Sequence, residues 1–135
     1  MTFSPAAAST IYRFLSDSGT SPSDYDLILT GDLGRVGSDI LVRLLMDNGV
    51  DIKANHNDCG LMIYDIQKQD VHAGGSGCGC SASVLCSKIL KEISAGKLKN
   101  VLFIATGALM SPTSVQQGES IPGVAHLVHI TGSEV

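Results

Sequence analysis

The sequence contains no tryptophan, and its 135 residues include only three tyrosines and three phenylalanines. The core therefore has to be mainly aliphatic. Basic residues are also scarce, because nine lysines and arginines stand against thirteen aspartates and glutamates, for a net charge of −4. Nucleic-acid binding usually needs a basic surface, so this balance argues against a nucleic-acid partner.

Long hydrophobic runs are missing as well. No stretch of about 18 apolar residues occurs, so no segment is expected to span a membrane. The first residues lack the basic segment and apolar core of a signal peptide. Four cysteines, at positions 59, 78, 80 and 86, are few for a disulfide framework in a chain of this size. We therefore expect free thiols and an intracellular protein.

What the sequence does contain is enough apolar material for a globular core, with 44% hydrophobic and 16% charged residues. A chain of this length buries roughly two-thirds of its unfolded surface. Stretches with apolar residues at helical spacing alternate with short continuous apolar runs that are typical of buried strands. This alternation predicts an α/β fold, with residues 1–135 as a single domain.

The pattern also places the individual elements. Ser4 is expected to cap the first helix, with Pro5 in its first turn. Glycines at positions 19, 49 and 96 are expected to end the three helices. Helices are predicted over residues 6–17, from Gly37 or Ser38 to Asn48, and from about Val84 to Gly96. Strands are predicted over 25–30, 59–64 (a short strand or extended segment), 101–105 and 124–130. We expect a mixed, mostly parallel sheet of about four strands packed with three helices, its last strand pairing antiparallel with its predecessor across the long loop 107–123.

The strongest candidate site is the glycine-rich stretch 71–83, which opens the third predicted helix. It holds glycines at positions 74, 75, 77 and 79 among other small residues. Such a turn leaves backbone N–H groups unpaired at the positive end of the helix dipole. That arrangement can hold an anion. The alternative is a tight loop that packs a helix against the sheet.

Catalytic and metal-binding interpretations of this stretch are weaker. Cys78 or Cys80 could act as a nucleophile with His72 as its base. Both thiols could equally be small buried hydrophobes. His56 and Cys59 could join these three residues around a metal, but paired Cys-x-x-Cys spacing is lacking, so no metal is expected. The stretch matches neither a P-loop nor a dinucleotide fingerprint, and we expect no cofactor.

Three further features are candidates outside the glycine-rich stretch. Asp32 follows a buried strand, where α/β sheets place ligand-handling groups, although a solvated turn explains it equally well. The long loop carries Gln116 and Gln117. Lysines gather in and after the third helix, where they either complement the helix dipole or contact an acidic partner or anionic membrane. These lysines are Lys88, Lys91, Lys97 and Lys99.

Several long runs resemble one protein family. They are Asp26–Gly34, Asn57–Tyr64, Ala73–Cys78, Ala105–Thr113 and Gln116–His126. Together they are similar to the C-terminal half of the stage V sporulation protein AD family of endospore-forming bacteria, from about Pro5 to Ile130. The resemblance implies a thiolase-like fold built from two similar α/β halves, of which this sequence supplies one half-fold.

The resemblance also implies a function. The family belongs to the sporulation apparatus that moves dipicolinate, with calcium, into the developing spore, and it binds dipicolinate. It also implies that the protein is located at the periphery of the spore inner membrane, next to other membrane components of the spore channel. Condensing enzymes with this fold carry a catalytic histidine just after a buried strand. Here that position reads Thr30–Leu33 without a histidine, so binding is expected and catalysis is not.

On this basis we expect the following ligand-binding residues: Asp32, His72, Gly74, Gly75, Ser76, Gly77, Cys78, Gly79, Gln116 and Gln117. Two alternatives remain open, a degenerate acyltransferase or condensing enzyme that uses Cys78 or Cys80, and a structural docking subunit of the channel.

The resemblance bears on the length of the chain too. A full family member is more than twice as long, and the strand that the fold places before the first helix is missing here. The strands at 27–30 and 101–105 would then lack a neighbour. We expect the chain to be a fragment or a split product, completed by the missing N-terminal half, by a second chain or by altered strand pairing.

Overall fold

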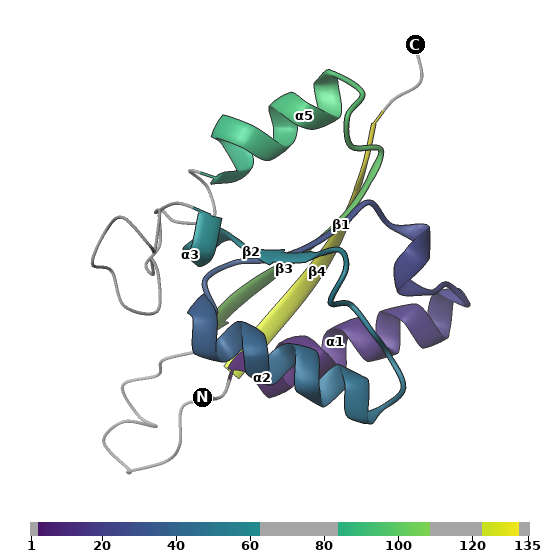
Figure 1. Cartoon of the computed structure of the whole chain (residues 1–135), viewed down its shortest axis with the longest axis vertical. Helices are drawn as coiled ribbons and strands as arrows, with labels where there is room; N and C mark the ends of the chain where they lie inside the picture. Colours follow the sequence, from purple (N-terminus) through teal and green to yellow (C-terminus); the bar gives the residue numbers. More distant parts are fainter. Residues whose placement is uncertain (1–2, 63–83, 109–122, 133–135) are drawn as a thin grey trace.

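The computed structural model describes residues 3–62, 84–108 and 123–132, and within them four strands form one mixed sheet (Figure 1). The strands are β1 (Leu27–Thr30), β2 (His56–Asp58), β3 (Asn100–Ala108) and β4 (Gly123–Thr131), in the order β2-β1-β3-β4. β1 runs parallel to both β2 and β3, whereas β4 runs antiparallel to β3. The predicted α/β class and mostly parallel sheet are confirmed.

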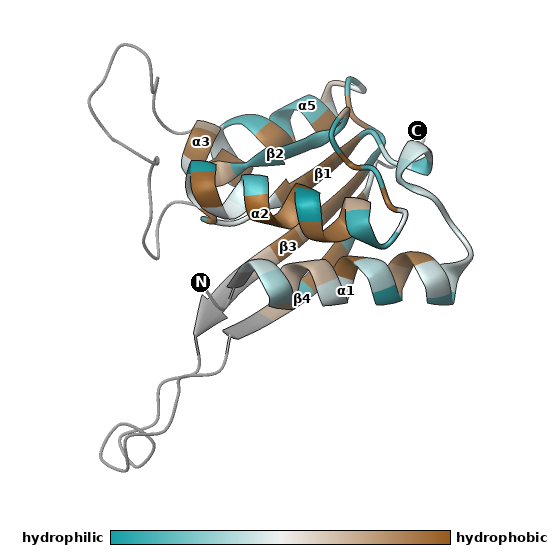
Figure 2. Ribbon diagram, turned by 60° about the horizontal axis from the view of Figure 1, so that its bottom comes forward, coloured by the Kyte–Doolittle hydropathy of each residue, from teal (hydrophilic) through white to brown (hydrophobic). Residues whose placement is uncertain are grey.

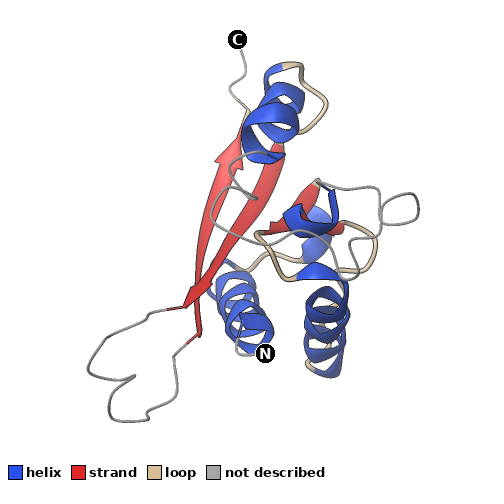
Figure 3. Cartoon of the chain, turned by 90° about the vertical axis from the view of Figure 1, so that its left-hand side faces the viewer, coloured by secondary structure: helices blue, strands red, loops and turns tan. Residues whose placement is uncertain are grey.

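Helices cover both faces of this sheet. α1 (Phe3–Ser18) and α2 (Gly34–Asp47) lie side by side on one face (Figure 3). On the other face, the π-helical turn η2 (Leu85–Ile89) continues into α5 (Leu90–Ser94). Two short elements complete the described part: the 3₁₀ turn η1 (Pro22–Asp24) and the single turn α3 (Cys59–Met62).

The core has two parts because successive residues of a strand point to opposite faces. Ile28 belongs to the larger cluster, between the sheet and helices α1 and α2, together with Ile11 and Leu41. Leu29, the next residue, belongs to the smaller cluster beneath α5, with Ile89. Apolar residues accordingly line the inner faces of the ribbon in Figure 2. The aliphatic core expected from the composition is therefore present.

The predicted helix ends are confirmed, but two helix starts are corrected. Gly19, Gly49 and Gly96 all adopt positive φ at the ends of their helices. α2, however, begins three residues before the predicted Gly37. Ser4 lies inside α1, where its buried hydroxyl donates to the Gly37 carbonyl oxygen at 2.9 Å. Ser4 therefore ties α1 to α2 instead of capping its own helix.

The strand predicted over residues 59–64 is wrong. Cys59–Met62 forms the helical turn α3, and the strand lies just before it, at His56–Asp58. A short apolar run does not distinguish a strand from a buried helical turn. The sequence shows no sign of β2 because its three residues are polar, and a strand at the edge of the sheet can keep a residue such as Asn57 exposed. Residues 63 and 64 lie outside the described part.

β1 and β3 pair directly, with Leu27 opposite Val101 and Thr30 opposite Ile104. At the start of both strands, the Asp26 carboxylate accepts hydrogen bonds from the backbone N–H groups of Lys99 at 2.7 Å and Asn100 at 3.0 Å. These bonds lower the pKa of Asp26.

β4 pairs with β3 along its whole length, so the predicted antiparallel pair across the long loop is confirmed. The β3–β4 ribbon extends beyond the rest of the sheet (Figure 3). On its α1 face, the His129 ring packs edge-on against Tyr25, with 5.4 Å between ring centroids, and the Thr10 hydroxyl donates to the Ala125 carbonyl oxygen at 2.9 Å. No helix within residues 3–62, 84–108 and 123–132 is long and apolar enough to cross a bilayer.

Candidate binding site

Polar side chains meet where the parallel strands β1 and β2 end. Thr30, the last residue of β1, lies opposite Asp58, the last residue of β2. Asp32 follows β1 by two residues, in the turn that leads into α2. Because ligands of open α/β sheets bind beyond the carboxyl ends of the strands, this end of the sheet is the candidate site.

Asp58 is the centre of this group and is fully buried. Its Oδ1 accepts hydrogen bonds from the Thr30 hydroxyl at 2.5 Å and from the Leu33 N–H at 3.0 Å. Its Oδ2 accepts from the N–H groups of Gly34 and Gly60, both at 3.0 Å. A carboxylate offers about four lone-pair sites, so these donors saturate it. Asp58 therefore has no acceptor site left for a ligand.

The same bonds give α2 an N-terminal cap from a distant part of the chain. The Leu33 and Gly34 amides would otherwise be unpaired donors at the start of α2. A carboxylate there also interacts favourably with the helix dipole. Burial nevertheless raises the pKa of Asp58, and the hydrogen bonds from Thr30, Gly34, Leu33 and Gly60 offset only part of that effect.

His56 joins the group through Thr30, with 3.1 Å between its Nε2 and the Thr30 hydroxyl oxygen. The Thr30 hydroxyl has one hydrogen to donate and two possible acceptors. It donates to Asp58, which is much closer than the Asn57 carbonyl oxygen at 3.4 Å. Nε2 must then donate to Thr30, which fixes the imidazole tautomer. Burial lowers the pKa of His56 to about 4, so the ring is neutral at pH 7.

The structure tests the predicted site residues unevenly. Asp32 lies where the sequence predicted it, half-buried just beyond the end of β1. The others lie outside the described residues: His72, Gly74, Gly75, Ser76, Gly77, Cys78, Gly79, Gln116 and Gln117. The described chain stops at Met62, at the end of α3 next to this group, and resumes at Val84.

Sequence reasoning missed Thr30 and Asp58 and gave His56 only as a possible metal ligand. Cys59, from the same possible set, is a buried thiol packed beneath α5 with Leu29 and Ile89. Within the described parts of the chain, no cluster of three or more histidine, cysteine or acidic side chains could hold a metal ion. A faint signal for Asp58 was present, since an aspartate two residues before a glycine often accepts the glycine N–H.

Comparison with known proteins identifies the family. The model of the family described as stage V sporulation protein AD matches residues 1–131. The chain belongs to this family. The stage V sporulation protein AD of Bacillus subtilis (strain 168) is 52% identical to it over 122 residues, which cover 90% of the chain. The chain spans 36% of the length of that curated relative.

Membership in the stage V sporulation protein AD family confirms the resemblance seen in the sequence. The match includes the Asp26–Gly34 and Asn57–Tyr64 runs, within which Thr30, Asp32 and Asp58 lie. The candidate site is therefore built on segments that carry the family resemblance.

Proposed function

We propose that this chain binds dipicolinate, without acting on it chemically, in the sporulation apparatus that moves dipicolinate with calcium into the developing spore. The observation that carries the proposal is the family match over residues 1–131. Dipicolinate is a small planar pyridine with two carboxylates. Backbone N–H groups at a glycine-rich helix start suit one such carboxylate, as expected for residues 74–79.

The geometry at the ends of β1 and β2 supports binding over catalysis. The oxygens of Asp58 are saturated by internal donors, and the Nε2 of His56 is engaged by Thr30. The resemblance to condensing enzymes would place their histidine in the stretch Thr30–Leu33, which has no histidine and carries Asp32 instead, and a carboxylate does not stabilise an oxyanion. The polar groups described here hold the backbone in place, which is a role that a binding scaffold needs.

Calcium would allow the Asp32 carboxylate to lie next to dipicolinate, which is itself negatively charged. Two carboxylates repel each other directly, but a Ca²⁺ ion takes oxygen ligands from several carboxylates at once. Asp32 would then contact calcium dipicolinate through the cation, as part of the ligand that is carried.

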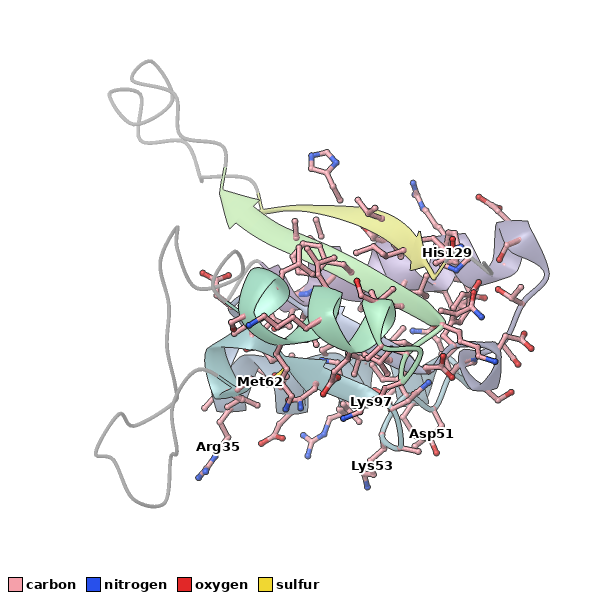
Figure 4. All side chains as sticks on the ribbon, turned by 90° about the horizontal axis from the view of Figure 1, so that it is seen from above. Arg35, Asp51, Lys53, Met62, Lys97 and His129 are labelled. Carbon is pink, nitrogen blue, oxygen red and sulfur yellow. The ribbon has the colours of Figure 1, made fainter. Side chains whose placement is uncertain are left out.

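Calorimetric titration tests the proposal. We expect a saturable heat when dipicolinate and calcium are added to the protein that contains this chain. Asp32→Ala is expected to weaken binding about tenfold, or about 1.4 kcal/mol, with calcium present and to have a smaller effect without it. Asp51→Ala is the matched control, since Asp51 is an exposed turn residue whose carboxylate accepts the Lys53 N–H (Figure 4). Absence of any heat from the intact protein would refute dipicolinate binding.

A second candidate function is docking to the spore membrane or to its acidic components. Its support is the exposure of all four lysines in and after the η2–α5 helix, and Figure 4 shows Lys97 on the turn after α5. Glu92 is the one acidic residue between positions 85 and 99. The lysines are Lys88, Lys91, Lys97 and Lys99.

Vesicle sedimentation checks this second function. Each lysine near an anionic bilayer contributes about 1 kcal/mol, and salt screens the attraction. Replacing the four lysines with glutamine is expected to abolish binding to phosphatidylserine-containing vesicles at low salt. The matched control replaces four other exposed basic residues with glutamine and is expected to keep the binding. They are Arg13, Arg35, Arg43 and Lys53. Equal loss in both variants would show a response to net charge and not to the lysine surface.

A further inference from the structure

We infer that Asp58 is a positioning residue of the binding site, which fixes the turn that carries Asp32. This inference rests on the proposed function and deepens it, because it names the group that sets the geometry of the described side of the site. Asp58 does not contact the ligand in this scheme. It acts through the backbone of residues 31–34.

The turn between β1 and α2 is fixed at both of its ends. The Gly31 N–H donates to the Ile104 carbonyl oxygen at 3.0 Å, which ties the start of the turn to β3. The Leu33 and Gly34 N–H groups donate to Asp58, which ties the end of the turn to β2. Asp32 lies between these anchors. Its backbone position is therefore set by two neighbouring strands.

The conformation held in this way is one that the chain does not adopt readily. Gly34 has a φ of 73°, in the left-handed region that side chains disfavour. The two bonds from Leu33 and Gly34 go to different oxygens of the same carboxylate. Together they specify both the place and the orientation of the turn, as a single bond could not.

The carboxylate cannot be replaced by an amide at this position. Asparagine has one acceptor oxygen, and its NH₂ group is a donor. Whichever way the amide is oriented, its NH₂ group would face a backbone N–H of the turn, either that of Leu33 or that of Gly34, and two donors cannot bond to each other. Asp58→Asn therefore breaks one of the two hydrogen bonds that hold the turn, with almost no change in side-chain volume.

Thr30 gives a second and independent way to test the same link. Its hydroxyl donates to Asp58 and accepts from His56, so it aligns the carboxylate. Thr30→Val removes the hydroxyl and keeps the shape of the side chain, whereas Thr30→Ser keeps the hydroxyl. A positioning role predicts that serine rescues what valine loses.

The experiment combines nitrogen-15 NMR of the protein with the dipicolinate titration in calcium. Asp58→Asn and Thr30→Val are expected to shift the amide resonances of Asp32, Leu33 and Gly34 and to weaken binding about tenfold or more. Thr30→Ser is expected to resemble the wild type in both measurements. Asp26→Ala is the matched control, because Asp26 also accepts two backbone N–H bonds, both on Oδ2, at the opposite end of β1.

Asp26→Ala removes both bonds and is expected to lower the melting temperature and to leave both the Asp32 resonance and the affinity unchanged. Loss of affinity that follows melting temperature across all four variants would overturn the inference, since a purely structural role predicts that result. An unchanged Asp32 resonance in Asp58→Asn would overturn it as well. If the wild-type protein binds no dipicolinate, the proposed function fails, and the resonances still decide whether Asp58 fixes the turn.

Discussion

Ile28→Ala is expected to lower the free energy of unfolding by about 3 to 4 kcal/mol. Ile28 is fully buried on β1, which has a strand on each side and helices α1 and α2 over the face that Ile28 occupies. Truncating it leaves a cavity among Ile11, Leu41 and Leu102, because side chains on two helices and a neighbouring strand cannot all move to fill it.

Urea unfolding followed by far-ultraviolet circular dichroism measures this loss, since the chain has no tryptophan to report by fluorescence. Val128→Ala is the control: Val128 is 53% exposed on the edge strand β4, and its truncation is expected to cost less than about 1 kcal/mol. Equal losses in the two variants would show that β1 is not the centre of the core.

Acidification from pH 7 to pH 4 is expected to cost about 3 kcal/mol of stability through His56 alone. Burial lowers the pKa of His56 from 6.5 to about 4, and each pKa unit corresponds to about 1.36 kcal/mol. Between pH 6.5 and pH 4, the unfolded chain therefore binds more protons at His56 than the folded chain does. Stability due to His56 is therefore complete above pH 6.5 and is lost as the pH falls towards 4.

Asp58 contributes with the opposite sign. Its folded pKa is raised above the usual 3.8, so between 3.8 and that raised value the folded chain binds more protons than the unfolded one. Its contribution to stability decreases as the pH rises through that window. Stability of the wild type should therefore fall less steeply near the acidic end than His56 alone would dictate.

His56→Gln separates the two effects, because glutamine can still donate to Thr30 and does not titrate. Urea unfolding between pH 7 and pH 4 is expected to show a much smaller loss for this variant than for the wild type. His126→Gln, which changes an exposed histidine on β4, is expected to keep the wild-type loss because His56 is intact. Parallel curves for the wild type and His56→Gln would contradict the assignment to His56.

Local patterns predicted those elements that their own residues determine. The spacing of Ile11 and Leu15 marks the buried side of α1, and Gly49 ends α2 because its φ of 78° suits glycine. The continuous apolar run of β3 marks a buried strand. Each of these features depends on residues that are close together in the sequence, so periodicity and glycine placement were enough to find them.

The missed features depend on partners that are far apart in the chain. Ser4 bonds to Gly37, and Asp58 bonds to Thr30, Leu33 and Gly34, across separations of 24 to 33 residues. No local pattern marks such pairs. β2 was misplaced for a related reason, since a polar edge strand of three residues is defined by its pairing with β1. The candidate site was found through Asp32 alone, because Asp32 follows the apolar run of β1 directly in the sequence.

Because β4 pairs with β3 on one side, half of its backbone N–H groups point to β3 and the other half point away from it. The Gly132 N–H donates to Lys99, and Thr10 reaches the Ala125 carbonyl oxygen from the opposite side. Since an antiparallel ladder alternates, the N–H groups of residues 126, 128 and 130 point to β3, and those of residues 127, 129 and 131 point away from it. Deuterium should therefore exchange first into the outward-facing amides of residues 127, 129 and 131. Slower exchange at these three residues alone would show that another chain pairs with the outer side of β4.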